Sequence, residues 1–136
     1  MTIVARTTTR VPDHTPERYN RRVEAETTQR VQLYAQHPRG IDARLNELDE
    51  EWDIERTLEA NAAALGLSGT LLGAFVDRRF LALPAVVSFF LLQHAIQGWC
   101  RPVPFFRRRG VRTAREIDIE RYALKALRGD FGPIGP

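Results

Sequence analysis

Two long apolar runs stand next to each other in the middle of an otherwise charged chain. Residues 60–76 contain no Asp, Glu, Lys or Arg, and neither do residues 80–100; the sequence Asp-Arg-Arg at 77–79 separates them. A helix that crosses a membrane needs about 20 mostly apolar residues. We therefore interpret residues 60–100 as a transmembrane hairpin of two helices joined by a tight turn. The alternative, a helical hairpin buried in a soluble protein, would need longer flanks to cover both runs.

The flanks predict further helices, so the expected fold class is all-α, with amphipathic cytoplasmic helices before and after the hairpin. Residues 1–14 are rich in Thr and Arg, and this composition predicts a flexible arm. Residues 15–59 form a charged helical region. Its first helix begins at Thr15, with Pro16 at the first helical position, and ends before Pro38.

A second helix is predicted from about residue 41, because apolar residues recur on one face at helical spacing. These residues are Ile41, Leu45, Leu48 and Trp52. Since no Gly or Pro separates Trp52 from residue 60, this helix can continue directly into the first membrane segment. Its other faces are strongly acidic. We interpret them either as a solvated surface or as a docking surface for a basic partner, which the protein's own C-terminal segment could supply.

Residues 101–136 form a basic C-terminal segment with one helix and a tail. Thr113 and Glu116 have the spacing of a capping box, which predicts a helix N-terminus. The helix then carries apolar residues on one face and ends at a glycine: Ile117, Leu124, Leu127 and Gly129. The last residues are rich in Gly and Pro and predict a loose tail.

The first apolar run carries small residues on one helical face, at Ala62, Gly66, Gly69 and Gly73. Small residues let helix backbones approach closely in lipid, and Gly69 with Gly73 forms a GxxxG motif. We expect this face to pack against another helix. The partner is either the second helix of the same hairpin or the same helix in a second copy, which would make the protein a homo-oligomer.

Basic residues beside the hairpin predict its orientation. The chain has 20 Lys and Arg against 17 Asp and Glu, a net charge of +3. Within about 20 residues of the apolar runs, two basic residues precede the hairpin and six follow it, against two in the turn. The positive-inside rule then places both termini in the cytoplasm and the turn outside, in the inner membrane of a bacterium.

The basic cluster after the hairpin is interpreted as a topological anchor that contacts lipid headgroups: Arg101, Arg107, Arg108, Arg109 and Arg112. Anionic lipids attract clusters of this kind. Nucleic-acid binding is not expected, because the cluster is short and no stacking aromatic side chains are interleaved with it. The expected partners are membrane lipids, together with a second copy or another membrane protein.

Two side chains of the second run are candidates for chemistry. His94 is ionisable inside a predicted span, where it could ligate haem or another cofactor, or hydrogen-bond across the hairpin. A single His supplies a haem site only across a dimer, so no cofactor is predicted. Cys100 lies beside Arg101, a cation that favours the reactive thiolate, but the position also suits a small interfacial residue. The sequence has no metal-ligand spacing, phosphate-binding loop or nucleophile motif.

The end of the second run carries a short motif, Gly98-Trp99-Cys100-Arg101-Pro102, followed by Gly110-Val111 after three arginines. It resembles the YgaP-like inner-membrane domain family. That family is bacterial and consists of small two-helix membrane units, largely of unknown function. Some members are joined to a rhodanese domain, which implies a link to sulfur transfer.

This resemblance covers roughly residues 55–113, and Gly98, Cys100 and Gly110 match it. The chain departs from the pattern because Arg101 stands between the cysteine and the proline. No rhodanese domain is recognised in it, so rhodanese activity is not implied.

Together these features predict a small integral membrane protein that serves as an anchor or an assembly subunit, with no enzymatic activity expected. The alternatives are sulfur or redox handling at the membrane through Cys100, and cofactor ligation by His94.

Overall fold

The structure, a computed structural model, describes residues 4–133, and this part of the chain is helical without a strand. The all-α fold class is therefore confirmed. In chain order the elements are α1 (Arg10–Asp13), α2 (Glu17–Gln36), the short 3-10 helix η1 (Pro38–Gly40), α3 (Ile41–Glu50), α4 (Ile54–Phe75), the 3-10 helix η2 (Arg78–Leu81), α5 (Ala82–Gln97), α6 (Pro102–Arg108) and α7 (Ala114–Arg128).

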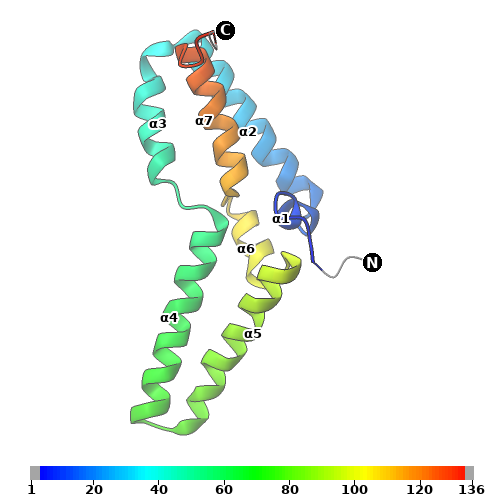
Figure 1. The fold of residues 1–136 in the computed structure, drawn as a ribbon, viewed down its shortest axis with the longest axis vertical. Helices are drawn as coiled ribbons and strands as arrows, with labels where there is room; N and C mark the ends of the chain where they lie inside the picture. The colour runs from blue at the N-terminus through cyan, green and yellow to red at the C-terminus, as the bar shows by residue number, and fades with distance from the viewer. Residues whose placement is uncertain (1–3, 134–136) are drawn as a thin grey trace.

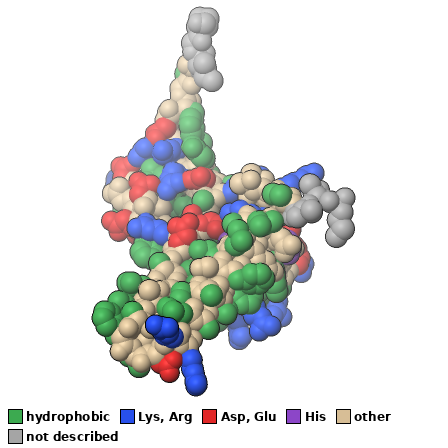
Figure 2. Space-filling view, turned by 60° about the horizontal axis from the view of Figure 1, so that its bottom comes forward, with side chains coloured by type: hydrophobic (Ala, Val, Ile, Leu, Met, Phe, Trp, Pro, Cys, Tyr) green, Lys and Arg blue, Asp and Glu red, His purple; other side chains and the backbone are tan. Residues whose placement is uncertain are grey.

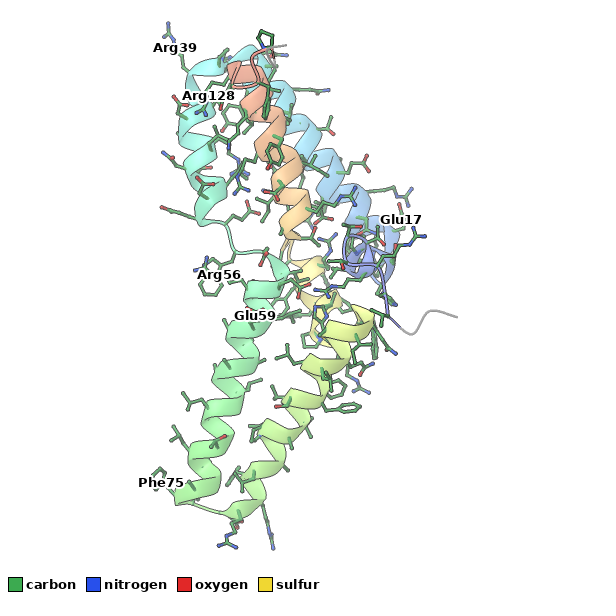
Figure 3. The ribbon with its side chains drawn as sticks, in the orientation of Figure 1. Glu17, Arg39, Arg56, Glu59, Phe75 and Arg128 are labelled. Carbon is green, nitrogen blue, oxygen red and sulfur yellow. The ribbon has the colours of Figure 1, made fainter. Side chains whose placement is uncertain are left out.

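α4 and α5 run side by side and project from a body made by the other helices (Figure 1). The turn between them forms the tip, at the end farthest from the body. Asp77 begins this turn, because its carboxylate accepts a hydrogen bond of 2.8 Å from the backbone N–H of Arg79. Phe75 lies near the tip, whereas Arg39 lies at the opposite end of the molecule (Figure 3). The polar turn is thus where the sequence predicts it.

One helical stretch in the described part of the chain is long and apolar enough to cross a membrane: Arg78–Gln97, which joins η2 and α5. The prediction of two such helices is therefore met in part. Large apolar side chains are exposed along both α4 and α5, including Leu67, Leu71, Phe75, Val86, Phe89 and Leu92. Figure 2 shows apolar side chains over the part of the molecule that carries the tip, with charged side chains gathered over the body.

The predicted continuous helix from residue 41 into the first apolar run is wrong, because the chain is extended between α3 and α4. Asp53 caps α4: its carboxylate accepts a hydrogen bond of 2.8 Å from the backbone N–H of Arg56. The side chain of Glu51 is bound by Arg112 from the segment before α7. Trp52 consequently leaves the apolar stripe; it is half exposed, and the guanidinium of Arg56 lies 4.5 Å from the centre of its ring.

The N-terminal residues also differ from the flexible arm expected for residues 1–14. Residues 1–3 lie outside the described part. From residue 4 onward the chain packs on the base of the hairpin: the backbone N–H of Ala5 donates to the carbonyl of Ile96 at 3.0 Å, and Val11 in α1 is buried. Thr15 donates to the carbonyl of Val11 at 2.7 Å, which closes the turn before α2 begins. The segment is short of apolar residues, so composition alone did not reveal its packing.

α7 lies between α2 and α3 in the body (Figure 1). Its apolar face meets that of α3 in a buried core: Ile41, Leu45, Leu48, Ile117 and Leu124. Leu127, predicted on the same face, is exposed. The capping box of Thr113 and Glu116 is present, and both of its hydrogen bonds form.

The acidic surface of α3 receives the C-terminal segment of the same chain. Arg128 binds Asp42 at 2.6 Å, and Arg121 binds Asp49 at 3.0 Å. Both arginines belong to α7. Contact with the protein's own basic segment is therefore confirmed, and because Asp42 and Asp49 stay largely exposed, so is the alternative of a solvated acidic face.

Candidate functional site

The candidate site lies where α4 and α5 leave the body and α6 crosses beside them (Figure 1). Buried apolar side chains from α1, α4, α6 and the turn before α6 join here: Val11, Ile54, Leu58, Cys100 and Val103. The backbone N–H of Ile54 donates to the carbonyl of Arg112 at 2.8 Å, which ties the start of α4 to the segment before α7. The hairpin is thus held at its base by a packed core.

His94 lies in the last turn of α5 and is 2% exposed. Its Nε2 is hydrogen-bonded to Glu55 Oε2 at 2.9 Å, and Arg10 donates to the other oxygen of this carboxylate at 2.8 Å. Arg10 also donates to the carbonyl of Ala95 at 3.1 Å. The hydrogen bond across the hairpin, one of the two roles predicted for His94, is confirmed. Three helices, α1, α4 and α5, meet in this polar cluster.

The carboxylate of Glu55 is bound from two sides, by Nε2 of His94 at 2.9 Å and by the guanidinium of Arg10 at 2.8 Å. Nε2 of His94 is engaged by Glu55, and the ring is buried. The geometry does not favour the other predicted role, cofactor ligation.

Cys100 is buried beside the imidazole of His94. The second ring nitrogen, Nδ1, has no hydrogen-bond partner of normal geometry among the described residues. Gly98 brings ring and thiol together, because its left-handed backbone (φ 72°) ends α5 and turns the chain toward α6. A Cβ at Gly98 would lie 2.4 Å from Cβ of Arg10, so the close approach of α1 also requires glycine.

An apolar groove of about 370 Å³ opens beside Cys100, between α4, α5 and α6. Its walls are mainly aliphatic and aromatic: Leu58, Leu65, Val87, Phe90, Leu91 and Phe106. Asn61 and the exposed Arg101 are the polar residues on its lining. Volumes of this size are typical of sites that hold small ligands. The thiol therefore borders an apolar space at the base of the hairpin.

A second polar cluster organises the body around Glu120, which is fully buried. Arg44 donates to its carboxylate at 2.8 Å, Arg30 donates at 3.1 Å, and Arg112 donates from a third side. Arg112 also binds Glu51 through two hydrogen bonds of 2.6 and 2.7 Å. Three guanidinium groups on one carboxylate thus join α2, α3 and α7 with the segment that precedes α7.

Arg107 forms the link between α6 and α7. It is 1% exposed, and its two terminal nitrogens donate to the carboxylate of Glu116 at 2.6 and 2.7 Å. The same guanidinium donates to Asn20 Oδ1 at 2.9 Å and to the carbonyl of Val111 at 3.1 Å. A paired and multiply hydrogen-bonded charge of this kind is structural.

The prediction that all five arginines after the hairpin contact lipid headgroups is therefore wrong for two of them. Arg107 and Arg112 are buried in ion pairs and are not available to lipid headgroups. Arg101, Arg108 and Arg109 are exposed, and Arg109 lies over the ring of Phe105 at 4.4 Å. The five arginines look alike in the sequence, because the acidic partners of the two buried ones lie in other segments of the chain.

Two of the four small residues predicted to pack helices do so within the chain. A Cβ on Gly69 would lie 2.6 Å from Cδ of Pro84, and a Cβ on Gly73 would lie 2.6 Å from Cγ of Leu81. A Cβ on Gly66 would meet nothing within 4 Å, and Ala62 lines the apolar groove. The GxxxG motif thus packs against the second helical stretch of the same hairpin. Nearer the body, at Gly66, α4 has no such close contact.

His94 and Cys100 could be predicted from the sequence, whereas Glu55, Arg10 and Glu120 could not. Glu55 and Glu120 stood among many surface-like carboxylates, and no local spacing distinguishes them. The available signal was weak: an ionisable His in an apolar helix needs a polar partner, and the acidic end of α4 lies at the same depth of the hairpin.

Comparison of the chain with protein-family models, with curated proteins and with solved structures finds no match. The similarity to the YgaP-like family accordingly stays a prediction that rests on the residues quoted above.

Acidification is expected to destabilise the body. Burial, the largest influence, acts to raise the pKa of Glu120, but hydrogen bonds from Arg44 and Arg112 outweigh it and hold this pKa below its usual 4.5. A carboxylate with a lower pKa in the folded state contributes stability above the unfolded pKa and loses it as the pH falls through the folded one. We expect the thermal unfolding midpoint in mild detergent to fall once the pH is below about 4.5. A midpoint that does not change down to about pH 2 would contradict this.

Proposed function

We propose that the protein is a small integral protein of a bacterial inner membrane, in which α4 and α5 anchor a cytoplasmic helical body that serves as an interaction or assembly unit. The observation that carries this proposal is the apolar surface of the hairpin. Phe89 and Leu92 are more than 60% exposed, and Leu67 is 62% exposed on the other helix. Soluble proteins rarely expose a continuous apolar surface of this extent.

The polar side chains of α4 also suit an apolar environment. Asn61, Ser68 and Thr70 each donate a hydrogen bond to the backbone carbonyl four residues earlier, at 2.7, 2.7 and 2.8 Å. In lipid, a polar group has no water to bind and is best satisfied within its own helix. These three side chains are therefore compatible with a membrane although they are exposed on the hairpin.

The geometry of the hairpin supports a crossing by α4 as well as by α5. If α5 crosses the bilayer, the tip lies on the far side, and α4 must return through the same bilayer to reach the body. α4 packs along α5, with Gly69 and Gly73 at the contact, so both helices enter together. The 20 Lys and Arg of the chain include two at the tip, Arg78 and Arg79, and the others lie at the body end. The positive-inside rule supports a cytoplasmic body.

Assembly with another membrane protein or a second copy belongs to the same proposal. Since Gly69 and Gly73 are occupied within the hairpin, a second copy would have to bind elsewhere on the exposed apolar surface. A second candidate function is thiol chemistry at Cys100, which the adjacent His94 and its contact with Glu55 favour.

Membrane integration is tested by alkaline carbonate extraction of membranes from bacteria that express the full chain. We expect the protein to stay in the pellet. The double substitution Phe89→Arg and Leu92→Arg should release it or abolish its accumulation, because each Arg near the centre of a span costs about 2.5–3.5 kcal/mol.

The matched control is Leu33→Arg with Leu127→Arg, two exposed apolar residues of the body. This variant should stay in the membrane pellet. Recovery of the unaltered protein in the carbonate supernatant would refute membrane integration.

A further inference from the structure

The groove beside Cys100 is an apolar space with this cysteine on its lining. Its walls come from α4, α5 and α6, and Leu58, Leu65, Phe90 and Phe106 line it together with the sulfur-bearing residue. Such a space suits a hydrocarbon chain, because its lining offers almost no hydrogen-bonding groups. Because Cys100 belongs to the lining, a hydrocarbon chain in the groove would lie next to this residue.

The thiol also has the neighbours that activate a nucleophile. His94 lies beside it, is 2% exposed, and has one ring nitrogen, Nδ1, without a hydrogen-bond partner of normal geometry among the described residues. The other nitrogen is fixed by Glu55 at 2.9 Å. A thiol, an imidazole and a carboxylate in this order form the arrangement in which an oriented base takes the proton of a nucleophile.

Exposed arginines lie on and near the groove beside Cys100. Arg101 follows the cysteine and lines the groove, and Arg108 and Arg109 are exposed on or next to α6. An apolar chain with an anionic, phosphate-bearing head is complementary to this combination of groove and arginines. Activated fatty acids carried as thioesters on a phosphorylated carrier have this chemistry.

We propose that Cys100 is an S-acylation site, at which the thiol accepts a long-chain acyl group from an acyl thioester and the acyl chain lies in the groove between α4 and α5. This inference rests on the proposed membrane location, which brings the groove to the depth of lipid chains. The modification would fix the base of the hairpin in the bilayer more firmly.

The reaction balances as a thioester exchange. His94 takes the thiol proton, the sulfur of Cys100 attacks the acyl carbonyl, and a new sulfur–acyl bond forms as the carbon–sulfur bond of the donor breaks. The proton then passes from His94 to the departing thiolate. No oxidant or reductant takes part. Glu55 acts as a positioning residue, because it holds the ring and does not reach the sulfur.

The test begins with intact-protein mass spectrometry of the full chain, purified from membranes in mild detergent. We expect a fraction that carries the mass of a long acyl chain, which hydroxylamine removes and which Cys100→Ser lacks. The purified unmodified protein should also accept an acyl group from palmitoyl-CoA much faster than from acetyl-CoA. Replacing Ala62, on the groove wall, with Phe should block palmitoyl transfer while iodoacetamide still alkylates the thiol.

Glu55→Gln separates a positioning role from a purely structural one. We expect its acyl transfer at neutral pH to slow by roughly tenfold or more, with a changed pH profile, when it is assayed below its own thermal midpoint. A protein that stays in the membrane pellet but carries no acyl group, and accepts none from palmitoyl-CoA, overturns the S-acylation site and leaves the membrane proposal intact. Equal transfer from acetyl-CoA and palmitoyl-CoA overturns the role of the groove.

Discussion

Replacing Glu120 with Ala is expected to lower the free energy of unfolding of the body by about 3–5 kcal/mol, the usual cost of removing one partner from a buried ion pair. Glu120 is fully buried and receives hydrogen bonds from Arg30, Arg44 and Arg112. Without its carboxylate, three positive charges face one another, and Arg112 is itself only 4% exposed. The loss is measured as a lower thermal midpoint in mild detergent.

Glu47→Ala is the matched control, because Glu47 binds the same Arg44 at 2.8 Å from an exposed position. Surface ion pairs of this kind contribute below about 1 kcal/mol. The two variants remove the same functional group from neighbouring ion pairs, and they differ mainly in burial. Equal thermal midpoints for Glu120→Ala and Glu47→Ala would show that the buried cluster does not hold the body together.

Replacing Gly69 with Leu is expected to disrupt the contact between α4 and α5 and to cost about 1–3 kcal/mol, as for other overpacked interiors. A Cβ at this position already lies 2.6 Å from Cδ of Pro84 and 3.0 Å from Cβ of Leu83. The ring of Pro84 cannot rotate away, so the helices must separate. The expected readouts are a lower thermal midpoint and faster proteolysis of the hairpin in detergent.

Gly66→Leu, one helical turn from Gly69, controls for the added side chain. A Cβ at Gly66 meets nothing within 4 Å, so this substitution should leave the midpoint unchanged or raise it slightly. If Gly66→Leu destabilises the protein as much as Gly69→Leu, the small-residue face does not act through contact with α5. A change in oligomer size with Gly66→Leu alone would place a second copy on that part of the helix.

The elements with local signals could be predicted from the sequence. The two apolar runs, the polar turn that Asp77 begins and the capping box of Thr113 each depend on residues within a few positions of one another. The apolar faces of α3 and α7 could be predicted for the same reason. The side chains His94 and Cys100 stood out because they are polar or reactive within an apolar run.

The features that the sequence did not reveal depend on contacts between distant segments. Arg10 and Glu55 are 45 residues apart, and Arg112 and Glu51 are 61 residues apart. A buried arginine and an exposed arginine have the same local pattern, so the sequence alone does not distinguish Arg107 from its exposed neighbours. The break between α3 and α4 has a similar cause, because Glu51 leaves the helix to bind a residue that comes much later in the chain.

The proposed topology, in which the hairpin crosses the bilayer twice with the body on the cytoplasmic side, is tested most directly by side-specific labelling. Single cysteines are introduced by Arg79→Cys at the tip and Arg39→Cys at the far end of the body, each with Cys100→Ser. A membrane-impermeant maleimide should label the Arg79→Cys protein in spheroplasts and the Arg39→Cys protein only in inverted vesicles. Labelling of both positions from the same side of the membrane would contradict the account.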